Sequence, residues 1–443
     1  MVYNIGLLGL GTVGSGVVQI LQTPQQRHRL IASMQISRVA VRSLDKPRDV
    51  GIPASLLTIH PEKVVTDPEI DIVVELMGGL EPARSLILQA IQAGKHVVTA
   101  NKAVIARYGA EIFRAAEARG VYVLLEGAVG GGIPIIQSLS QSLAANRLQS
   151  IQGIINGTTN FILSQMSQSQ TSYEEALQIA QQRGYAEADP TADVDGWDAV
   201  DKIAILASLG FSAQIDRDAI LCEGIRSVTD ADIRYAREWG FVIKLLGIAQ
   251  RYQPTAGAGG DSSAILDVRV HPALLPLSHP LASVHQVDNA ILVQGDPLGQ
   301  VMLVGPGAGR GATASAVVSD LLLLLAQLPT TPSLSNPLLR FPVPQAVVLQ
   351  KREDWRSEFY VRLIAQDQPG VIGVIGSAFG RWGVSLECIM QKASHEATAE
   401  IVILTHTVSE ANFQQAIEQI RQQELILSIA SVLRVQREVV ADY

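Results

Sequence analysis

Residues Gly9 to Gly14 read GLGTVG, a glycine-rich turn that is the strongest indication of the fold. It follows an apolar run, Tyr3–Leu8, and opens a helical pattern that continues to Leu21. In this context Gly9 permits a tight turn, Gly11 lets backbone N–H groups approach a pyrophosphate, and Gly14 allows close packing of helix on strand. A plain glycine turn is the alternative, but the position between a strand and a helix favours a dinucleotide-binding turn.

The rest of the first 135 residues continues this alternation of strand and helix. Helical patterns at Pro82–Ala93 and Lys102–Arg119 are each followed by a glycine, as helix C-termini often are. Further strand candidates are Gln35–Val41, Asp71–Leu76, His96–Thr99 and Val121–Leu125. Nearly all-apolar strands that alternate with helices predict an α/β domain, a Rossmann-type doubly wound parallel sheet.

Three further segments follow this dinucleotide-binding domain (1–135). Residues 136–308 combine a cluster of helices with later strands, and we expect an α+β substrate-binding and dimerisation domain. Its helices are predicted at Ile135–Ala145, Thr159–Met166, Tyr173–Arg183 and Trp197–Leu209, and Ser172 with Glu175 predicts a capping box at the start of the third. A helix at 309–328 is expected to return to the first domain. Residues 329–357 carry repeated prolines and are expected to form a linker. Residues 358–443 have the order β-α-β-β-α-β, which predicts a ferredoxin-like module.

Composition and charge limit the classes of function. The chain has 443 residues, 47% of them hydrophobic, and a net charge of −8, which argues against a nucleic-acid surface. The N-terminus has no signal-peptide pattern, the apolar run Leu321–Leu325 is too short to span a bilayer, and no segment resembles a membrane-surface helix. Two distant cysteines, Cys222 and Cys388, form no disulfide framework, so a reducing cytoplasm is expected.

An acid-rich segment, 184–202, reads GYAEADPTADVDGWDAVDK. Its carboxylates Glu187, Asp193 and Asp198 could hold a zwitterionic substrate, and Lys202 lies one helical turn after Asp198. A lysine can supply a proton if burial lowers its pKa, and Lys102, placed directly after a strand end, is a second candidate. The alternative is a helix cap with an ordinary surface ion pair, worth only about 0.2–0.5 kcal/mol.

Two other residues suggest ligands, each with a structural alternative. Arg42 follows the second strand where an NAD enzyme usually carries an acid, so it favours the 2′-phosphate of NADP, unless it is a solvated surface arginine. Glu126 precedes a glycine-rich stretch whose freed carbonyls could bind a hard cation. A flexible loop with a surface glutamate would have the same sequence.

The motifs together resemble the homoserine dehydrogenase family over essentially the whole chain. They are GLGTVG, TANKA, LLEGAVGGGIP, GIINGTTNFIL, GYAEADPTADVDGWDAVDK and GPGAGRGATASAVVSD. The resemblance implies NAD(P)H-dependent reduction of L-aspartate 4-semialdehyde to L-homoserine, in the biosynthesis of threonine, methionine and isoleucine. The C-terminal module, with Asp367–Gly370 at its first turn, looks like an ACT domain. That likeness implies allosteric inhibition by threonine, with oligomerisation alone as the alternative.

The resemblance also assigns roles to individual residues. It implies that Lys202 is the proton donor and that Lys102 lies near nicotinamide and substrate, while Glu187 and Asp198 hold the substrate. A sodium site is implied for Glu126, Val129, Gly131 and Ile133. Cofactor contacts, in addition to the glycine turn, are implied for Thr12, Val13, Arg42, Gly184 and Gly309. The expected assembly is a homodimer or a homotetramer.

Two rival functions remain at this point. A phosphorylating semialdehyde dehydrogenase would share the dinucleotide fold but needs a cysteine nucleophile, and neither Cys222 nor Cys388 lies in a fitting motif. A non-catalytic amino-acid sensor would retain the fold without the chemistry. The presence of both lysines and the substrate carboxylates favours the enzyme.

Overall fold

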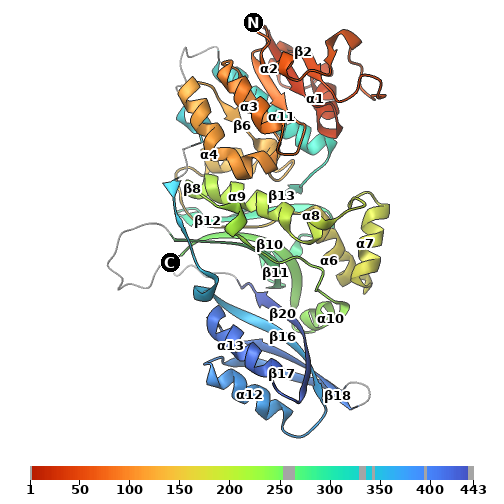
Figure 1. Cartoon of the computed structure of the whole chain (residues 1–443), viewed down its shortest axis with the longest axis vertical. Coiled ribbons are helices and arrows are strands. Elements are labelled where there is room, and N and C mark those ends of the chain that lie inside the picture. Colours follow the sequence, from red (N-terminus) through yellow and green to blue (C-terminus); the bar gives the residue numbers. More distant parts are fainter. Residues whose placement is uncertain (1, 253–264, 329–335, 342–344, 394–396, 438–443) are drawn as a thin grey trace, which may run out of the picture. The chain divides into compact units, whose positions relative to one another are not determined.

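The computed structural model describes residues 2–252, 265–328, 336–341, 345–393 and 397–437, and the chain separates into two compact units (Figure 1). The first unit comprises residues 1–157, 200–220 and 288–347, and the second comprises 158–199, 221–287 and 348–443. Four of the prolines predicted to mark the linker, Pro329, Pro332, Pro342 and Pro344, lie outside the described residues. Among the described residues, no helix is long and apolar enough to cross a membrane.

The first unit contains a six-stranded sheet in the order β3-β2-β1-β4-β5-β6, and all its strands are parallel. The strands are β1 (Tyr3–Leu8), β2 (Met34–Ala40), β3 (Leu57–Thr58), β4 (Ile72–Glu75), β5 (His96–Thr99) and β6 (Val123–Leu124). Their order reverses between β1 and β4, and ligands of such sheets bind at the carboxyl ends of the strands at this point. The predicted doubly wound sheet is confirmed.

Helices cover both faces of this sheet. On one face α1 (Thr12–Gln22) and α11 (Arg310–Gln327) pack against each other and bury Val17, Val317 and Leu321 with the strand residues Ile5 and Leu7. The other helices of the alternating pattern are α2 (Glu62–Val65), α3 (Ala83–Gln92) and α4 (Lys102–Arg119). The helix predicted at 309–328 therefore does pack on the dinucleotide fold.

A smaller antiparallel group of strands, in the order β13-β12-β7, completes the first unit. The strands are β7 (Arg147–Ile154), β12 (Asp288–Asp296) and β13 (Gly299–Pro306). The helix predicted at Ile135–Ala145 is wrong in its details, because α5 (Ile135–Gln137) changes directly into a π-helical turn, Ser138–Ser142. In this wider turn Leu143 N donates to Ser138 O, five residues back, and Leu139 and Leu143 are both buried.

The second unit begins with the two predicted helices α6 (Gly157–Ser169) and α7 (Tyr173–Gln182), followed by a short helix that was not predicted, α8 (Thr191–Val194). Ser172 and Glu175 form the predicted capping box of α7, each side chain bonding the backbone N–H of the other. The helix α9 (Trp197–Phe211) starts in this unit and continues in the first. Two long antiparallel strands follow α10 (Asp230–Glu238): β10 (Phe241–Tyr252) and β11 (Ile265–Pro276).

The C-terminal module has the predicted β-α-β-β-α-β order. Its elements are β16 (Arg356–Gln366), α12 (Val371–Arg381), β17 (Leu386–Ala393), β18 (Thr398–Thr405), α13 (Glu410–Arg421) and β20 (Ile426–Val435). The strands run β20-β16-β18-β17 in space, and both helices pack on one face of this sheet. In the same unit β20 also pairs in parallel with β11, through Ala273 and Arg434. The end of the module is thus joined to the β10–β11 pair.

Candidate active site

The glycine turn lies at the floor of a pocket of about 880 Å³ at the carboxyl ends of β1, β2 and β4. Gly9 has a φ of +102°, and a Cβ on Gly14 would lie 2.3 Å from the Gly9 carbonyl oxygen. Both glycines therefore serve the geometric roles predicted for them. Gly9, Gly11 and Thr12 line this pocket, where the N-terminus of α1 offers backbone N–H groups.

Basic side chains gather in the same pocket. Arg42, Lys46, Arg48 and Arg310 all line it. The acid Asp49 is paired with Arg310 at 2.5 Å between Nη1 and Oδ2. The sequence reasoning missed Lys46 and Arg48, although their place just after β2 and Arg42 was a usable signal.

A second pocket, of about 260 Å³, brings Lys102 and Lys202 together. Val13 of the glycine turn and Gly131 of the glycine-rich loop also line it, and Leu76 and Met77 line both pockets. Residues from four separate parts of the sequence therefore meet in the first unit. The two lysines and these two glycine-containing segments were each predicted from sequence, and the structure places them in one hollow.

The position of Lys102 is fixed by a buried polar network. Lys102 is the first residue of α4, and the side chain of the capping residue Asn101 accepts from Val104 N. Asn101 Nδ2 also donates to Gly79 O at 2.8 Å, and Thr99 Oγ1 donates to Glu75 Oε2 at 2.7 Å. Glu75 is fully buried, and burial raises its pKa. Sequence reasoning did not find Glu75, because it reads as the end of an apolar strand.

Lys202 lies in a buried stretch of α9 and is 8% exposed. Its Nζ donates to Ile155 O at 2.7 Å, which directs the side chain away from solvent. Asp198 is also buried, at 7% exposed. A solvated ion pair on a helix surface requires exposed side chains, so this burial disfavours the alternative in which the two residues serve only as a surface pair.

The glycine-rich loop is anchored by two buried carboxylates. Glu126 Oε1 and Oε2 accept from Ile136 N (2.9 Å) and Gln137 N (2.7 Å), and Glu126 N donates to Asp320 Oδ2 at 2.8 Å. Burial raises the pKa of Glu126 to about 7. Burial, and then the neighbouring charge of Glu126, raise the pKa of Asp320 well above its ordinary value. Glu126 is thus buried, not a surface residue of a flexible loop.

Of the other predicted sodium ligands, Val129 and Ile133 are buried and Gly131 has a φ of +55°. The Ile133 carbonyl accepts from Ile135 N at 2.8 Å, which leaves it one lone pair for another partner. A set of backbone carbonyls beside two buried carboxylates is chemically suited to a hard cation.

Residues 184–199 of the acid-rich segment belong to the second unit, whereas Lys202 belongs to the first. Asp193 lies in α8 and is partly buried, while Asp198 lies in the first turn of α9. Glu187 is exposed, and its backbone carbonyl accepts from Gln181 Nε2 at 3.2 Å. Gly184 ends α7 with a φ of +73° in this same unit, whereas Gly309 caps α11 in the first.

The two cysteines lie elsewhere. Cys222 is in the short strand β9 (Leu221–Cys222) and Cys388 is exposed on β17, and neither lines the two pockets described.

Comparison with known proteins agrees with this arrangement. Residues 9–126 match the family model for the NAD binding domain of homoserine dehydrogenase, residues 134–322 match the model for homoserine dehydrogenase, and residues 359–425 match the ACT domain. A homoserine dehydrogenase from Synechocystis sp. is 57% identical over 98% of this chain and 100% of its own length.

Two solved structures extend this comparison. A homoserine dehydrogenase from Thiobacillus denitrificans has a TM-score of 0.89 at 42% identity and covers 99% of this chain and 98% of its own. A hyperthermophilic archaeal homoserine dehydrogenase in complex with NADPH has a TM-score of 0.60 at 26% identity, covering 76% of this chain and 100% of its own.

Proposed function

This chain belongs to the homoserine dehydrogenase family and is an NAD(P)-dependent oxidoreductase, and we propose that it reduces L-aspartate 4-semialdehyde to L-homoserine with NADPH. The observation that carries this proposal is the meeting of Lys102 and Lys202 in one pocket beside the glycine turn. The same reaction would serve the biosynthesis of threonine, methionine and isoleucine. A cytoplasmic location is part of this proposal.

The proposed chemistry divides between coenzyme and protein. The nicotinamide, when bound, supplies the hydride. Lys202 gives a proton to the aldehyde oxygen as the alcohol forms, and Lys102 stabilises the negative charge that develops there. Lys202 Nζ is held by its buried hydrogen bond to Ile155 O, and Asn101, the residue before Lys102, is held by hydrogen bonds to Gly79 O and Val104 N, so little reorganisation is needed during the reaction.

The substrate is an amino acid, and we assign its recognition to carboxylates. Glu187, Asp193 and Asp198 would bind its ammonium group and polar oxygens by charge-assisted hydrogen bonds. Because these carboxylates would bind an ammonium group, the assignment favours an amino-acid aldehyde as the substrate over an uncharged aldehyde. For the domains we propose the boundaries 1–135 with 309–328, 136–308, 329–357 and 358–443.

NADP is the proposed coenzyme, with NAD as the alternative. Arg42, Lys46 and Arg48 in the glycine-turn pocket favour a 2′-phosphate. Gly184 and Gly309 remain proposed coenzyme contacts. We also propose a sodium ion at the loop of Glu126, Val129, Gly131 and Ile133, where it would hold the loop that borders the lysine pocket.

Threonine is the proposed effector of the ACT module, bound near the turn Asp367–Gly370 between paired modules of a homodimer or homotetramer. This turn joins β16 to α12 and is exposed, and Asp367 Oδ1 accepts from Gln391 Nε2 at 3.1 Å. A ligand here would contact two elements of the module at once.

A steady-state assay tests the proposal. Purified protein with aspartate semialdehyde should oxidise NADPH, and threonine should slow this reaction. Alkylation of the exposed Cys388 should leave the rate unchanged, and alkylation of Cys222, whose Sγ donates to Asp195 O, should affect the KM for the substrate but not abolish turnover. A phosphate-dependent reaction abolished by alkylation would support the rival acylating enzyme. Threonine binding without turnover of either nicotinamide would support the sensor.

A further inference from the structure

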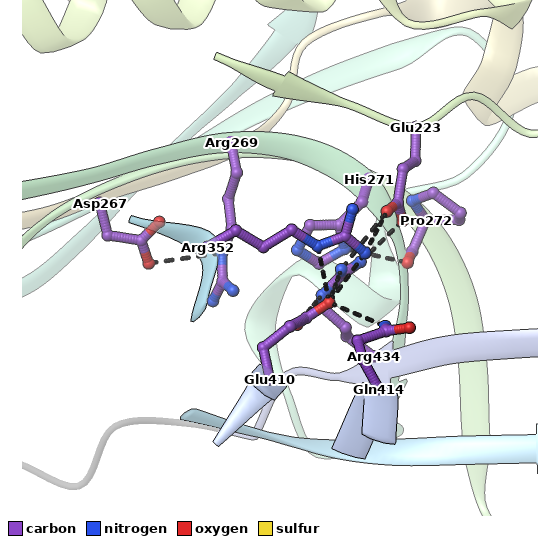
Figure 2. A network of polar contacts seen from close by, with 9 residues as sticks. All are labelled: Glu223, Asp267, Arg269, His271, Pro272, Arg352, Glu410, Gln414 and Arg434. Carbon is purple, nitrogen blue, oxygen red and sulfur yellow. Dashed lines mark hydrogen bonds and ion pairs between the residues drawn. The ribbon is translucent and has the colours of Figure 1, made fainter. Parts of the chain in front are cut away.

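A buried arginine of the C-terminal module forms hydrogen bonds and ion pairs with residues both inside and outside that module (Figure 2). Arg434, on β20, is 5% exposed. Its Nη1 and Nη2 donate to the two carboxylate oxygens of Glu223 at 2.7 and 3.3 Å. Its Nε and Nη2 donate to the two oxygens of Glu410 at 3.1 and 2.6 Å. One guanidinium thus binds two carboxylates, each through both oxygens, which fixes their directions as well as their distance.

The two carboxylates belong to different parts of the unit. Glu410 is the first residue of α13, within the C-terminal module. Glu223 directly follows β9, and its N–H donates to Val270 O of β11 at 2.9 Å. The ion pair between Arg434 and Glu223 therefore links the C-terminal module to residues 222–226, which comprise the last residue of β9 and the turn that follows it.

The turn at 222–226 is hydrogen-bonded to the acid-rich segment. Ile225 N donates to Val194 O at 2.8 Å, and Cys222 Sγ donates to Asp195 O at 3.0 Å. Arg226 Nε donates to Asp195 Oδ1 at 2.5 Å. A Cβ on Gly224 would lie 2.3 Å from Val194 O, so the two backbones are in direct contact. The turn and the acid-rich segment are packed as one piece.

We propose that Arg434 and Glu223 are positioning residues for substrate binding. Through the turn at 222–226 they fix the positions of the Asp193 and Asp198 carboxylates. The inference rests on the proposed function, in which these carboxylates hold the amino-acid substrate. Asp195 lies between them, so a displacement of the turn displaces both. Removing the Arg434 guanidinium leaves Glu223 and Glu410 with Arg352, whose Nη2 lies 3.4 Å from Glu223 Oε1 and 2.9 Å from Glu410 Oε1. Glu223 then keeps one long contact to a side chain that is 45% exposed, so its direction is no longer fixed through both of its oxygens.

The first test compares two arginines. Arg434→Gln should raise the KM for homoserine by about tenfold or more, because a small misplacement of binding groups is costly, while the KM for the nicotinamide changes by less than about twofold. Arg437→Gln is the matched control. Arg437 also binds two carboxylates, Glu358 and Glu387, but both lie in the C-terminal module.

The second test does not depend on the enzyme's substrate. Hydrogen exchange at the amides of Asp195 and Gly196, which donate to Thr191 O and Asp193 O, should accelerate in Arg434→Gln and not in Arg437→Gln. If Arg434→Gln does not fold, Glu223→Gln is used, since that side chain is 35% exposed and tolerates change better.

Wild-type protein that turns over no homoserine would contradict the proposed function, and the exchange measurement would still decide the positioning role. Unchanged exchange, or equal increases of both KM values, would overturn the inference.

Discussion

Lys102, at the start of α4, and Lys202, inside α9, line a single pocket of the first unit. Leu76 and Met77 connect this pocket with the one that contains the glycine turn. Two ammonium groups beside a dinucleotide turn can stabilise an oxygen that becomes negative and then protonate it.

Substitution Lys202→Met should reduce kcat by roughly 10²–10⁴-fold, the range for loss of a positioned acid. The apolar part of the side chain is kept, so the fold should persist, as measured by circular dichroism and thermal unfolding. Lys351→Met, at an exposed lysine, is the control. A decrease smaller than about tenfold would mean that another group supplies the proton.

Substitution Arg42→Asp should weaken NADP more than NAD. A charge-assisted hydrogen bond is worth about 1.5–3 kcal/mol, so the KM for NADP should rise by about tenfold to a hundredfold. Arg27→Asp makes the same charge change at an exposed residue that does not line the pocket. Equal effects on both coenzymes would remove Arg42 from the 2′-phosphate site, leaving Lys46 and Arg48 as candidates.

Local sequence signals predicted most of the fold. The alternation around Tyr3–Leu8 and the glycine turn specified a parallel sheet, and the capping box at Ser172 specified the start of α7. The β-α-β-β-α-β pattern likewise gave the C-terminal module. These features depend on residues that are close in sequence, so the periodicity of apolar residues, the capping residues and the turn residues indicate them directly.

Features that depend on distant contacts were not accessible in this way. Glu75 reads as part of an apolar strand, and only the fold brings Thr99 and Asn101 to its carboxylate. Arg434 likewise looks like any strand residue until β20 lies beside β11. The π-helical turn at Ser138–Ser142 was missed because its wider spacing differs locally from the α-helical period.

Substitution Asp367→Ala should reduce inhibition by threonine and leave the uninhibited rate unchanged. The reason is that Asp367 lies in the exposed turn of the ACT module where we expect the effector to bind. Titration of the rate with threonine gives the half-inhibiting concentration, with Glu424→Ala as the control at another exposed acid of the module. A half-inhibiting concentration equal to that of the wild type would place the effector elsewhere.

Stability should fall at acidic pH partly through His96. Burial lowers the pKa of His96 to about 4, and its Nδ1 accepts from Tyr122 N at 3.0 Å, which requires an unprotonated nitrogen. Between pH 6.5 and about 4 the unfolded chain therefore binds more protons than the folded one, so stability falls as the pH falls, by roughly 3 kcal/mol at the lower end.

The variant His96→Asn isolates this contribution, because asparagine keeps an acceptor for Tyr122 N and does not titrate. Its melting temperature should fall less than that of the wild type when the pH is lowered across this range. Parallel melting curves for the two proteins would show that His96 is not the responsible group.

Transfer of a labelled hydride from homoserine to the coenzyme would demonstrate the proposed reaction. Homoserine in which both hydrogens on the hydroxyl-bearing carbon are replaced by deuterium is incubated with NADP and the protein, and the reduced coenzyme is analysed by mass spectrometry. We predict one deuterium per reduced nicotinamide, and none with Lys202→Met on the same timescale. Reduced coenzyme without deuterium, or no reduced coenzyme with either nicotinamide, would contradict a hydride transfer between this amino acid and the coenzyme.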